Sequence, residues 1–325
     1  MTQSSTQDVP VRKDVSVLIV GALLPRLQES VEGHFNATRL WELPDRDAWL
    51  AANGAQVQAV VTSGVWGANA ELLGQLPNLE AIFSFGVGYD SIAVDVARDR
   101  GIVVTNTPAV LDDCVADTAM ALTLDVMRGF SAADRFVRAG KWTAGRFPLA
   151  TKVGGKKVGI VGLGNIGQAI AKRAAAFDMQ VLYHNRSPKA GVDYQYFADL
   201  DDMLKACDVA ILAVPGGSAT DGLIDAKRLE SLGEKGFLIN ISRGSVVDQS
   251  ALLAALQQGR IAGAGLDVFE DEPHVPEAFF ALDNAVLFPH LGSGTHETRQ
   301  AMGDLVWSNI RGWFHDDRKV LTPVR

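Results

Sequence analysis

Short apolar runs alternate with amphipathic stretches along most of the chain. The runs are rich in β-branched residues, which is typical of strands buried on both faces of a parallel sheet. The stretches between them repeat their apolar residues at helical spacing. In the first part of the chain we expect strands at 15–21, 38–42, 57–63, 79–85 and 102–105, and helices at 26–35, 45–52 and 92–100. This alternation indicates a parallel sheet with helices on both faces, and therefore a domain of its own.

The same alternation resumes after an Ala-rich helical stretch at 111–138, with Gly129 as a candidate break, and an irregular loop at 142–155. The second set of strands is expected at 158–161, 180–184, 208–214, 237–241, 262–268 and 284–288, with helices at 200–207, 226–232, 249–259 and 297–315. The last helix carries an apolar stripe of Met302, Leu305, Val306, Ile310 and Trp313, which suits packing back onto the first domain. The fold class is therefore α/β, with two doubly wound parallel-sheet domains.

Three glycines follow the apolar run at 158–161 and precede a helical pattern. They are Gly162, Gly164 and Gly167, in the spacing GxGxxG. The first allows a tight turn, the second lets backbone approach a pyrophosphate, and the third lets helix and strand pack closely. The helix N-terminus would present free N–H groups to the phosphates. This context predicts a dinucleotide site, with cofactor contacts from Gly162, Leu163, Gly164, Asn165, Ile166 and Gly167.

The turn after the strand at 180–184 bears on the choice of dinucleotide. An NAD site uses an acid about 20 residues after the first glycine to bind the ribose 2′-hydroxyl. Residues 180–190 contain no acid, and Asn185, Arg186, Ser187 and Lys189 stand there instead. These side chains suit a 2′-phosphate. NADP(H) is therefore the preferred cofactor and NAD(H) is possible; the alternative is that the two cations are ordinary solvated charges.

Composition narrows the function classes. The chain has 325 residues and a net charge of −8, which argues against a nucleic-acid partner because phosphate binding needs a basic field. Its two cysteines, Cys114 and Cys207, offer neither a disulfide framework nor a metal site, and we expect both to be core thiols. The polar residues 1–14 suggest a frayed tail, and no apolar run reaches membrane-spanning length. A cytoplasmic protein is expected.

Polar residues follow several predicted strands at the sheet edge where parallel sheets bind ligands. Val87 and Gly88 lie in a glycine-rich loop whose N–H groups could bind a carboxylate. Arg243 follows the strand at 237–241, an acidic turn at 270–272 follows the next, and His290 follows the last. Taken singly, Arg243 is interpreted as a surface charge, the acidic turn as solvated, and His290 as a structural histidine. Behind a dinucleotide motif they indicate a cation, an orienting acid and an acid/base imidazole.

The other histidines lack such a setting. We expect His34 and His315 on helix surfaces and His184 near the cofactor ribose. His274 and His296 fall in a loop and at a helix start, with no evident partner. His290 is therefore the one candidate acid/base histidine.

Five segments together resemble the D-isomer-specific 2-hydroxyacid dehydrogenase family over nearly the whole chain. They span 87–117, 158–173, 239–248, 265–273 and 289–299. The acid-free ribose turn and the last segment look most like the NADPH-preferring glyoxylate/hydroxypyruvate reductase branch. The family's Arg, Glu and His fall on Arg243, Glu272 and His290. The acid is the one directly before the proline.

The resemblance implies a domain organisation and an assembly. A flavodoxin-like substrate-binding domain would comprise residues 1–108 and 291–325, and a Rossmann dinucleotide-binding domain residues 109–290. The active site would lie in the cleft between them, and the protein would be a homodimer built through the cofactor domain and the 110–150 region. Beyond the glycine turn and residues 185–187, the expected cofactor contacts are Val214, Pro215, Ile241, Ser242, Arg243, Asp267, His290 and Gly292.

The implied reaction is hydride transfer from the nicotinamide to C2 of a small 2-oxo acid, which gives the D-2-hydroxy acid. His290 would protonate the forming alkoxide, help worth roughly 10²–10⁴-fold in rate. Glu272 would favour the imidazolium form. Arg243 would bind the substrate carboxylate and carbonyl oxygen, with the amides of Val87 and Gly88 on the carboxylate.

Two alternatives remain open. One is NAD-dependent oxidation of another acid, of the phosphoglycerate or formate type. The other is a nucleotide-sensing regulator of the same fold, which the intact Arg, Glu and His set makes less favoured.

Overall fold

The computed structural model describes residues 10–324, which form two compact units. Unit 1 comprises the chain up to Leu111 together with the segment from Thr295 onward, and unit 2 runs from Asp112 to Gly294. These bounds lie three and four residues from the 108/109 and 290/291 divisions expected from the sequence. The roles assigned to the two domains stay predictions at this point.

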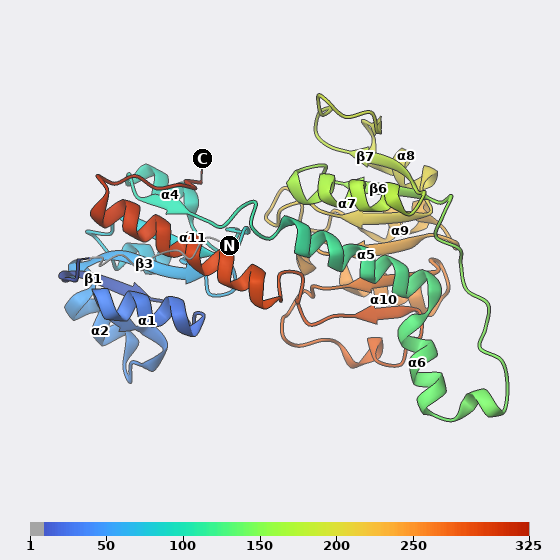
Figure 1. Cartoon of the computed structure of the whole chain (residues 1–325), viewed down its shortest axis with the longest axis horizontal. Coiled ribbons are helices and arrows are strands. Elements are labelled where there is room, and N and C mark those ends of the chain that lie inside the picture. The colour runs from blue at the N-terminus through green and yellow to red at the C-terminus, as the bar shows by residue number, and fades with distance from the viewer. Residues whose placement is uncertain (1–9, 325) are drawn as a thin grey trace. The chain divides into compact units, whose positions relative to one another are not determined.

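Unit 1 is built on a five-stranded parallel sheet in the order β2-β1-β3-β4-β5 (Figure 1). Its strands are β1 (Arg12–Ile19), β2 (Phe35–Arg39), β3 (Val57–Ser63), β4 (Ala81–Phe85) and β5 (Val103–Thr105). Its helices are α1 (Pro25–His34), α2 (Arg46–Asn53), α3 (Ala70–Gly74), α4 (Val94–Asp99) and α11 (His296–His315). From β1 the chain first moves to β2 on one side and then returns past β1 to β3 on the other side. The direction in which strands are added to the sheet therefore reverses between β1 and β3.

The two faces of the unit 1 sheet are covered by different helices. Leu18, Val60 and Ile82 face a core that they share with α2, α3 and α4. On the other face, α11 packs against α1 and β4, and the ring of Phe314 contacts those of Phe35 and Phe83. The final helix therefore returns to the first domain, as its apolar stripe predicted. Within that stripe only Leu305 is half-buried rather than buried.

Unit 2 contains a seven-stranded parallel sheet in the order β12-β11-β10-β9-β6-β7-β8. Its strands are β6 (Lys157–Val161), β7 (Gln180–His184), β8 (Gln195–Phe197), β9 (Val209–Leu212), β10 (Phe237–Asn240), β11 (Gly263–Leu266) and β12 (Ala285–Leu287). Its helices are α5 (Asp112–Arg128), α6 (Phe130–Arg138), α7 (Asn165–Ala176), α8 (Leu200–Ala206), α9 (Ala226–Leu232) and α10 (Gln249–Gln257). Gly129, at φ 67°, separates α5 from α6, so the predicted break is confirmed.

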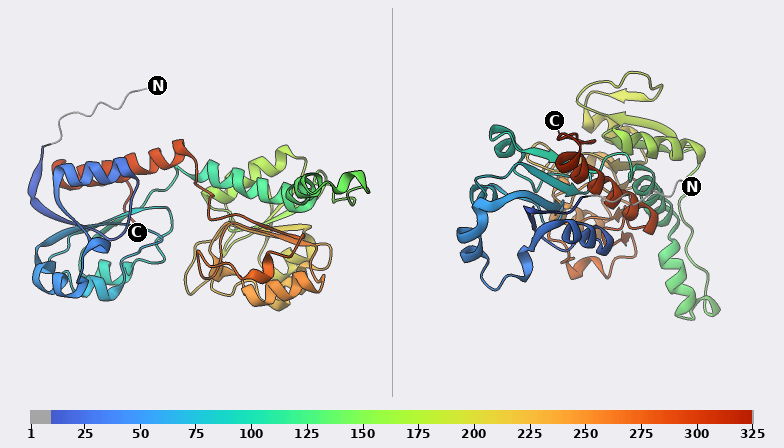
Figure 2. Two further views of the ribbon diagram at one scale, coloured as in Figure 1. Left: turned by 90° about the horizontal axis from the view of Figure 1, so that it is seen from below. Right: turned by 60° about the vertical axis from the view of Figure 1, so that its left-hand side comes forward.

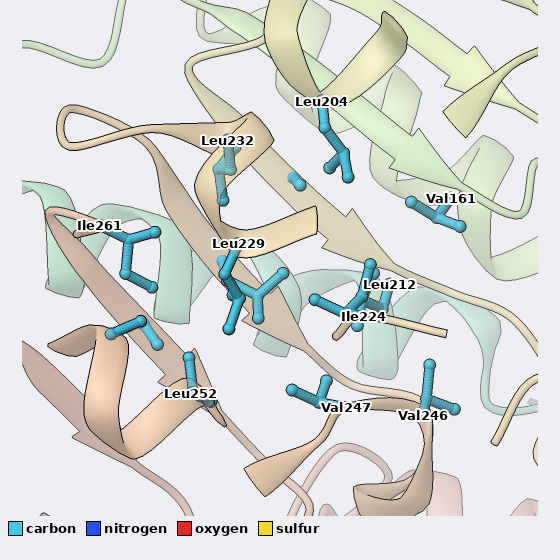
Figure 3. Packing of buried hydrophobic residues seen from close by; sticks show 14 of the residues in the cluster. Val161, Leu204, Leu212, Ile224, Leu229, Leu232, Val246, Val247, Leu252 and Ile261 are labelled. Carbon is cyan, nitrogen blue, oxygen red and sulfur yellow. The ribbon is translucent and has the colours of Figure 1, made fainter. Parts of the chain in front are cut away.

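Helices cover both faces of the unit 2 sheet. Figure 2 shows α5 and α7 on one face, and α8, α9 and α10 on the other. The second layer holds a continuous aliphatic core, part of which Figure 3 shows around Leu204, Leu212 and Leu229. Burial of such side chains contributes about 1.5–3 kcal/mol each and fixes the strand ends on which the polar loops depend.

One predicted strand has the wrong bounds, and two short elements were not predicted. The strand expected at 38–42 begins at Phe35, which is fully buried, and residues 40–42 form a 3-10 turn. Helix α3 was missed because it is short and depends on Asn69, whose side chain accepts a hydrogen bond from Leu72 N–H. Strand β8 was missed because it is a three-residue edge strand that pairs with β7 alone in the sheet.

The interpretation of residues 1–14 as a tail is wrong for Arg12–Asp14, which begin β1; residues 1–9 lie outside the described part. Lys13 helps to hold the start of β1 in place, since its Nζ donates to the carbonyls of Glu32 and Phe35 at 2.6 and 2.8 Å. His34 and His315 were expected on helix surfaces, but both are half-buried. Their rings pack with Trp307 and Phe35, respectively.

The two cysteines differ in their surroundings. Cys207 is buried, and burial raises the pKa of its thiol to about 12, so it is a core thiol as predicted. Cys114 is only half-buried on α5.

Among residues 10–324, no group of three or more His, Cys, Asp or Glu side chains is arranged to hold a metal ion. No described helix has the length and apolar character needed to cross a membrane.

Candidate active site

The turn between β6 and α7 has the geometry that the three glycines predict. Gly162 adopts φ +97°, and a Cβ there would lie 2.6 Å from the carbonyl oxygen of Ala213. A Cβ on Gly167 would collide with the carbonyl oxygen of Gly162. A Cβ on Gly164 would meet no atom within 4 Å. The first and third glycines are therefore required by packing, whereas the second leaves open space at the helix N-terminus, which fits a pyrophosphate.

Two side chains hold this turn in place. The backbone N–H of Leu163 donates to Oδ1 of Asn185 at 2.8 Å, and the hydroxyl of Tyr196 donates to the Asn185 carbonyl at 3.2 Å. Asn185 was predicted as a cofactor contact, but its side-chain oxygen is used within the protein. Tyr196 was not predicted, because it comes from the edge strand β8 that the sequence pattern did not reveal.

The start of α7 is also in contact with the start of α5. The side chain of Asn165 hydrogen-bonds to the carboxylate of Asp112, and Ile166 is half-buried. Burial and the neighbouring Asp113 raise the pKa of Asp112, while the contact from Asn165 opposes that rise. Arg173, farther along α7, forms ion pairs with Asp113 and Asp117 of α5. The two helices that cover this face are thus joined at the glycine turn.

The end of β7 presents the residues proposed to select the dinucleotide. Arg186 and Ser187 are exposed, and Lys189 is half-buried with its backbone N–H donating to the hydroxyl of Tyr183. Within the described part of the chain the Arg186 guanidinium makes no hydrogen bond or ion pair, so it is available to a ligand. His184 is engaged, since its Nδ1 lies 3.0 Å from the carbonyl oxygen of Phe197.

A buried asparagine shapes the loop that carries Arg243. Oδ1 of Asn240 accepts from the N–H of Ser242 at 3.0 Å, and its Nδ2 donates to the carbonyl of Arg243 at 2.9 Å. The hydroxyl of Ser242 accepts from the N–H of Val214 at 3.0 Å. Ser242 thus joins two predicted cofactor segments, while Ile241 is buried and Pro215 is exposed. Asn240 was missed; a single Asn ending an apolar strand was the available signal.

Gly244 brings the Arg243 loop against the acidic loop that follows β11. A Cβ at this position would collide with the backbone of Phe269 and Glu270. Only glycine therefore allows the two loops to touch. Glu270 is held in turn by its N–H, which donates to Oε1 of Gln249.

Glu272 and His290 form a hydrogen-bonded pair. Nδ1 of His290 lies 2.6 Å from Oε2 of Glu272, and the other carboxylate oxygen accepts from the N–H of Phe269 at 3.0 Å. Burial would raise the pKa of Glu272, but the hydrogen bond from His290 and that from Phe269 outweigh it and lower the pKa. The carboxylate is therefore charged near neutral pH. It fixes the ring so that the opposite nitrogen, Nε2, is the one left for a ligand.

Asp267 supports the backbone on which His290 sits. Its carbonyl accepts from the N–H of His290 at 2.9 Å, and its carboxylate accepts from the N–H groups of Leu291 and Gly292 at 2.7 and 2.9 Å. His290 itself has φ +52°. Burial raises the pKa of Asp267 while the two amides counteract that rise. Asp267 and Gly292, predicted as cofactor contacts, thus use these polar groups to hold the histidine loop.

The neighbouring acids do not share this arrangement. Asp271 lies 3.7 Å from Nδ1 of the exposed His274, and Glu272 is the acid that contacts His290. The contact expected between Glu272 and His290 is therefore present in unit 2, and the catalytic role of the pair stays a prediction.

In unit 1, the loop after β4 has two available amides. Gly86 has φ +134° and its N–H donates to Oγ1 of Thr107, while Nδ2 of Asn106 donates to the Val87 carbonyl at 2.8 Å. Over the described residues, the N–H groups of Val87 and Gly88 donate no hydrogen bond. The loop is thus fixed by its neighbours while two donors stay free for an anion.

A Rossmann-type sheet with this glycine turn and a paired imidazole and carboxylate defines a nicotinamide-dependent oxidoreductase. Residues 120–292 match the family model of the D-isomer specific 2-hydroxyacid dehydrogenase NAD binding domain. The chain belongs to this family of enzymes.

Similar proteins agree with this assignment. A glyoxylate/hydroxypyruvate reductase A of Arabidopsis thaliana is 45% identical over 312 residues, which cover 96% of this chain and 99% of that protein. A 2-ketogluconate reductase of Gluconobacter oxydans is 45% identical over 308 residues, covering 95% and 98%. The crystal structure of an NADPH-dependent glyoxylate/hydroxypyruvate reductase from Sinorhizobium meliloti, in complex with NADP and malonate, is similar with a TM-score of 0.90 at 44% identity, covering 96% and 97%.

The glycine turn gives a matched pair of substitutions. In Gly164→Ala the added methyl group enters open space, so the thermal unfolding midpoint should stay within about 2 °C of the parent while KM for the cofactor rises about 10-fold or more. In Gly167→Ala the methyl group meets the Gly162 carbonyl, so the free energy of unfolding should fall by about 1–3 kcal/mol. Thermal denaturation and cofactor titration measure both. A destabilised Gly164→Ala protein with unchanged cofactor affinity would contradict this assignment.

Proposed function

We propose that this chain reduces a small 2-oxo acid, similar to glyoxylate or hydroxypyruvate, to the D-2-hydroxy acid with NADPH. The observation that carries the proposal is the 2.6 Å contact between Glu272 and His290, on a loop packed against the one that bears Arg243. The names of the relatives support the same substrate class, since they describe reductases of glyoxylate, hydroxypyruvate and 2-ketogluconate.

The residues of this chain would divide the reaction among them. His290 holds a proton on Nε2 and gives it to the substrate oxygen as negative charge develops there. Glu272 keeps the ring oriented and favours its protonated form. Arg243 would bind the substrate carboxylate together with the carbonyl oxygen, because a guanidinium presents two parallel donors. In unit 1, the amides of Val87 and Gly88 are the proposed donors to a carboxylate.

The glycine turn fits the pyrophosphate of the cofactor, and Arg186 with Ser187 would bind its 2′-phosphate. When bound, the nicotinamide supplies the hydride. The protein contributes orientation, the proton and the positive charge that binds the acid. Arg186 is exposed and unpaired within the described residues, which supports NADPH as the preferred form, with NADH possible.

Cofactor choice can be tested on a panel of small 2-oxo acids with both nicotinamides. We expect kcat/KM to be higher with NADPH. Arg186→Ala should lower it about 10- to 100-fold with NADPH and leave it nearly unchanged with NADH, because only the contact to the 2′-phosphate is lost. Lys172→Ala, an exposed cation on α7, is the control and should change neither value. Equal losses with both cofactors would exclude Arg186 as the phosphate ligand.

The pairing of Glu272 with His290 makes a second, signed prediction. Reduction needs the protonated imidazole, and a carboxylate favours that form, so Glu272→Gln should shift the alkaline limb of the reductive kcat/KM profile to lower pH. Oxidation of the hydroxy acid needs the neutral ring, so its acidic limb should move in the same direction. His290→Gln should remove the pH-dependent limb and lower kcat/KM roughly 10²-fold or more.

Arg243→Ala is the comparison for the pH experiment. It should act mainly on substrate binding, raise KM for the oxo acid and leave the position of the limbs nearly unchanged. Rates in both directions across the range on either side of neutrality are the measurement. If both limbs stay in place in Glu272→Gln, the pair does not control the proton.

We also propose a cytoplasmic homodimer. Helix α6 and the segment after it extend away from the unit 2 sheet (Figure 1) and expose Phe130, Val137, Trp142 and Leu149. A set of large apolar side chains that no neighbour covers is typical of a protein–protein interface.

Light scattering at micromolar concentration tests the dimer. We expect a mass close to twice the 34.7 kDa of one chain. Placing a charge in the interface, as in Val137→Glu with Trp142→Glu, should yield monomers, because a buried unpaired carboxylate is costly. Phe280→Glu, at an exposed apolar residue elsewhere in unit 2, should stay dimeric. A monomeric parent protein would refute the proposal.

A further inference from the structure

Unit 1 contains a cavity of about 420 Å³ that the proposed reaction does not use. Its walls are formed by Val20, Leu40, Trp41, Arg46, Trp66, Gly67, Ala68, Asn69, Leu72 and Ser91. Val20 follows β1, Leu40 and Trp41 follow β2, and the segment from Trp66 follows β3. The cavity therefore lies beyond the carboxyl ends of three parallel strands. Its volume is within the range of small-molecule sites.

The topology of unit 1 favours a ligand at this place. In the order β2-β1-β3-β4-β5, the chain passes from β1 to one side of the sheet and then to β3 on the other side. Ligands of open α/β sheets bind outside the carboxyl ends of the strands at such a switch point, and in this strand order it lies between β1 and β3. Val20 and Trp66 line the cavity from these two strands.

The side chains around the cavity have a definite chemical character. Trp41 and Trp66 are 40% and 54% exposed, so each presents much of its indole to a ligand. The indole of Trp66 packs directly on the backbone of Gly21, where a Cβ would collide with the ring. Leu40 and Leu72 add buried apolar surface. Aromatic walls of this kind bind planar apolar groups.

Arg46 is the cation of the cavity. It is exposed at the start of α2, and within residues 10–324 its guanidinium forms no ion pair or hydrogen bond. Two acids flank it in the sequence. Asp45 is engaged as the N-cap of α2, where Oδ1 accepts from the N–H of Ala48 at 3.0 Å, and Asp47, in the first turn of α2, forms no ion pair with Arg46 within the described residues. An available guanidinium beside indole walls is complementary to a carboxylate attached to a ring.

We propose that this cavity is a second binding site, and that it takes a small aromatic carboxylate with its ring against the indoles of Trp41 and Trp66 and its carboxylate on Arg46. Its walls include none of the residues proposed for the reaction. It is built into the same loops, however. The N–H of Ala68 donates to the Ser91 carbonyl at 3.1 Å, and the Ser91 hydroxyl donates to the Gly64 carbonyl at 2.8 Å.

Isothermal titration of the full-length protein with 3-phenylpropionate tests the site. This probe has an aromatic ring and a carboxylate but no 2-oxo group, so it cannot be reduced. We expect saturable binding with a dissociation constant on the order of 1 mM or below. Arg46→Gln should weaken it about 10-fold or more, and Arg26→Gln, which removes an exposed arginine from α1 of the same unit, should not. The uncharged 3-phenylpropan-1-ol should bind about 10-fold more weakly than the acid.

Two further variants separate this site from the catalytic one. Trp66→Leu should lose affinity while its circular dichroism and unfolding midpoint stay close to those of the parent, since the indole is largely exposed. Arg243→Ala should bind 3-phenylpropionate as the parent does, whether or not it retains reductase activity. Absence of binding, equal affinity in Arg46→Gln, or loss of binding in Arg243→Ala would each overturn the proposal. The last result would place the probe in the catalytic site instead.

Discussion

The parallel register of β10, β11 and β12 is the constraint on which the candidate active site depends. Asn240 pairs with Leu266, and Leu266 with Leu287, so the three strands end side by side at one edge of the sheet. Arg243, Asp267 and His290 follow these ends within three residues. Buried aliphatic side chains fix the register, because a slip of one residue would turn each strand's core residues toward the opposite face. Because Gly244 has no Cβ, the loop that carries Arg243 can also touch the loop that follows β11.

Two carboxylates at this edge do different work because their partners differ. Asp267 is buried, and over residues 10–324 its carboxylate accepts from backbone N–H groups alone, so it acts on the shape of the histidine loop. Glu272 accepts from one backbone N–H and from the ring of His290, so it acts on the orientation and charge of the imidazole. Deep burial raises the pKa of Asp267 in spite of its two amide hydrogen bonds. At Glu272 burial is outweighed by the hydrogen bonds from His290 and Phe269 and by the neighbouring positive charge, so its pKa falls.

The sequence could predict what depends on local pattern. The apolar runs located the central strands to within a few residues, and the strand at 57–63 agrees with β3 at both ends. What it could not predict depends on contacts between distant residues. Nothing local distinguishes Glu272 from the two acids before it, and only the family resemblance did so. Likewise, the use of Asn185 and Asn240 to fix loops follows from where their backbone partners lie in the fold.

The same topological rule yields different ligand chemistry in the two units. In unit 2, Gly162 and Gly164 follow β6 and lead into α7, whose first turn has free N–H groups beside open space. In unit 1, Gly21 also follows the first strand, but the indole of Trp66 covers it, and α1 begins at Pro25, which has no N–H to donate. The backbone of unit 1 therefore cannot bind a phosphate in the way that unit 2 can. A ligand at its switch point would depend more on side chains, and those that line the cavity include two indoles and a guanidinium.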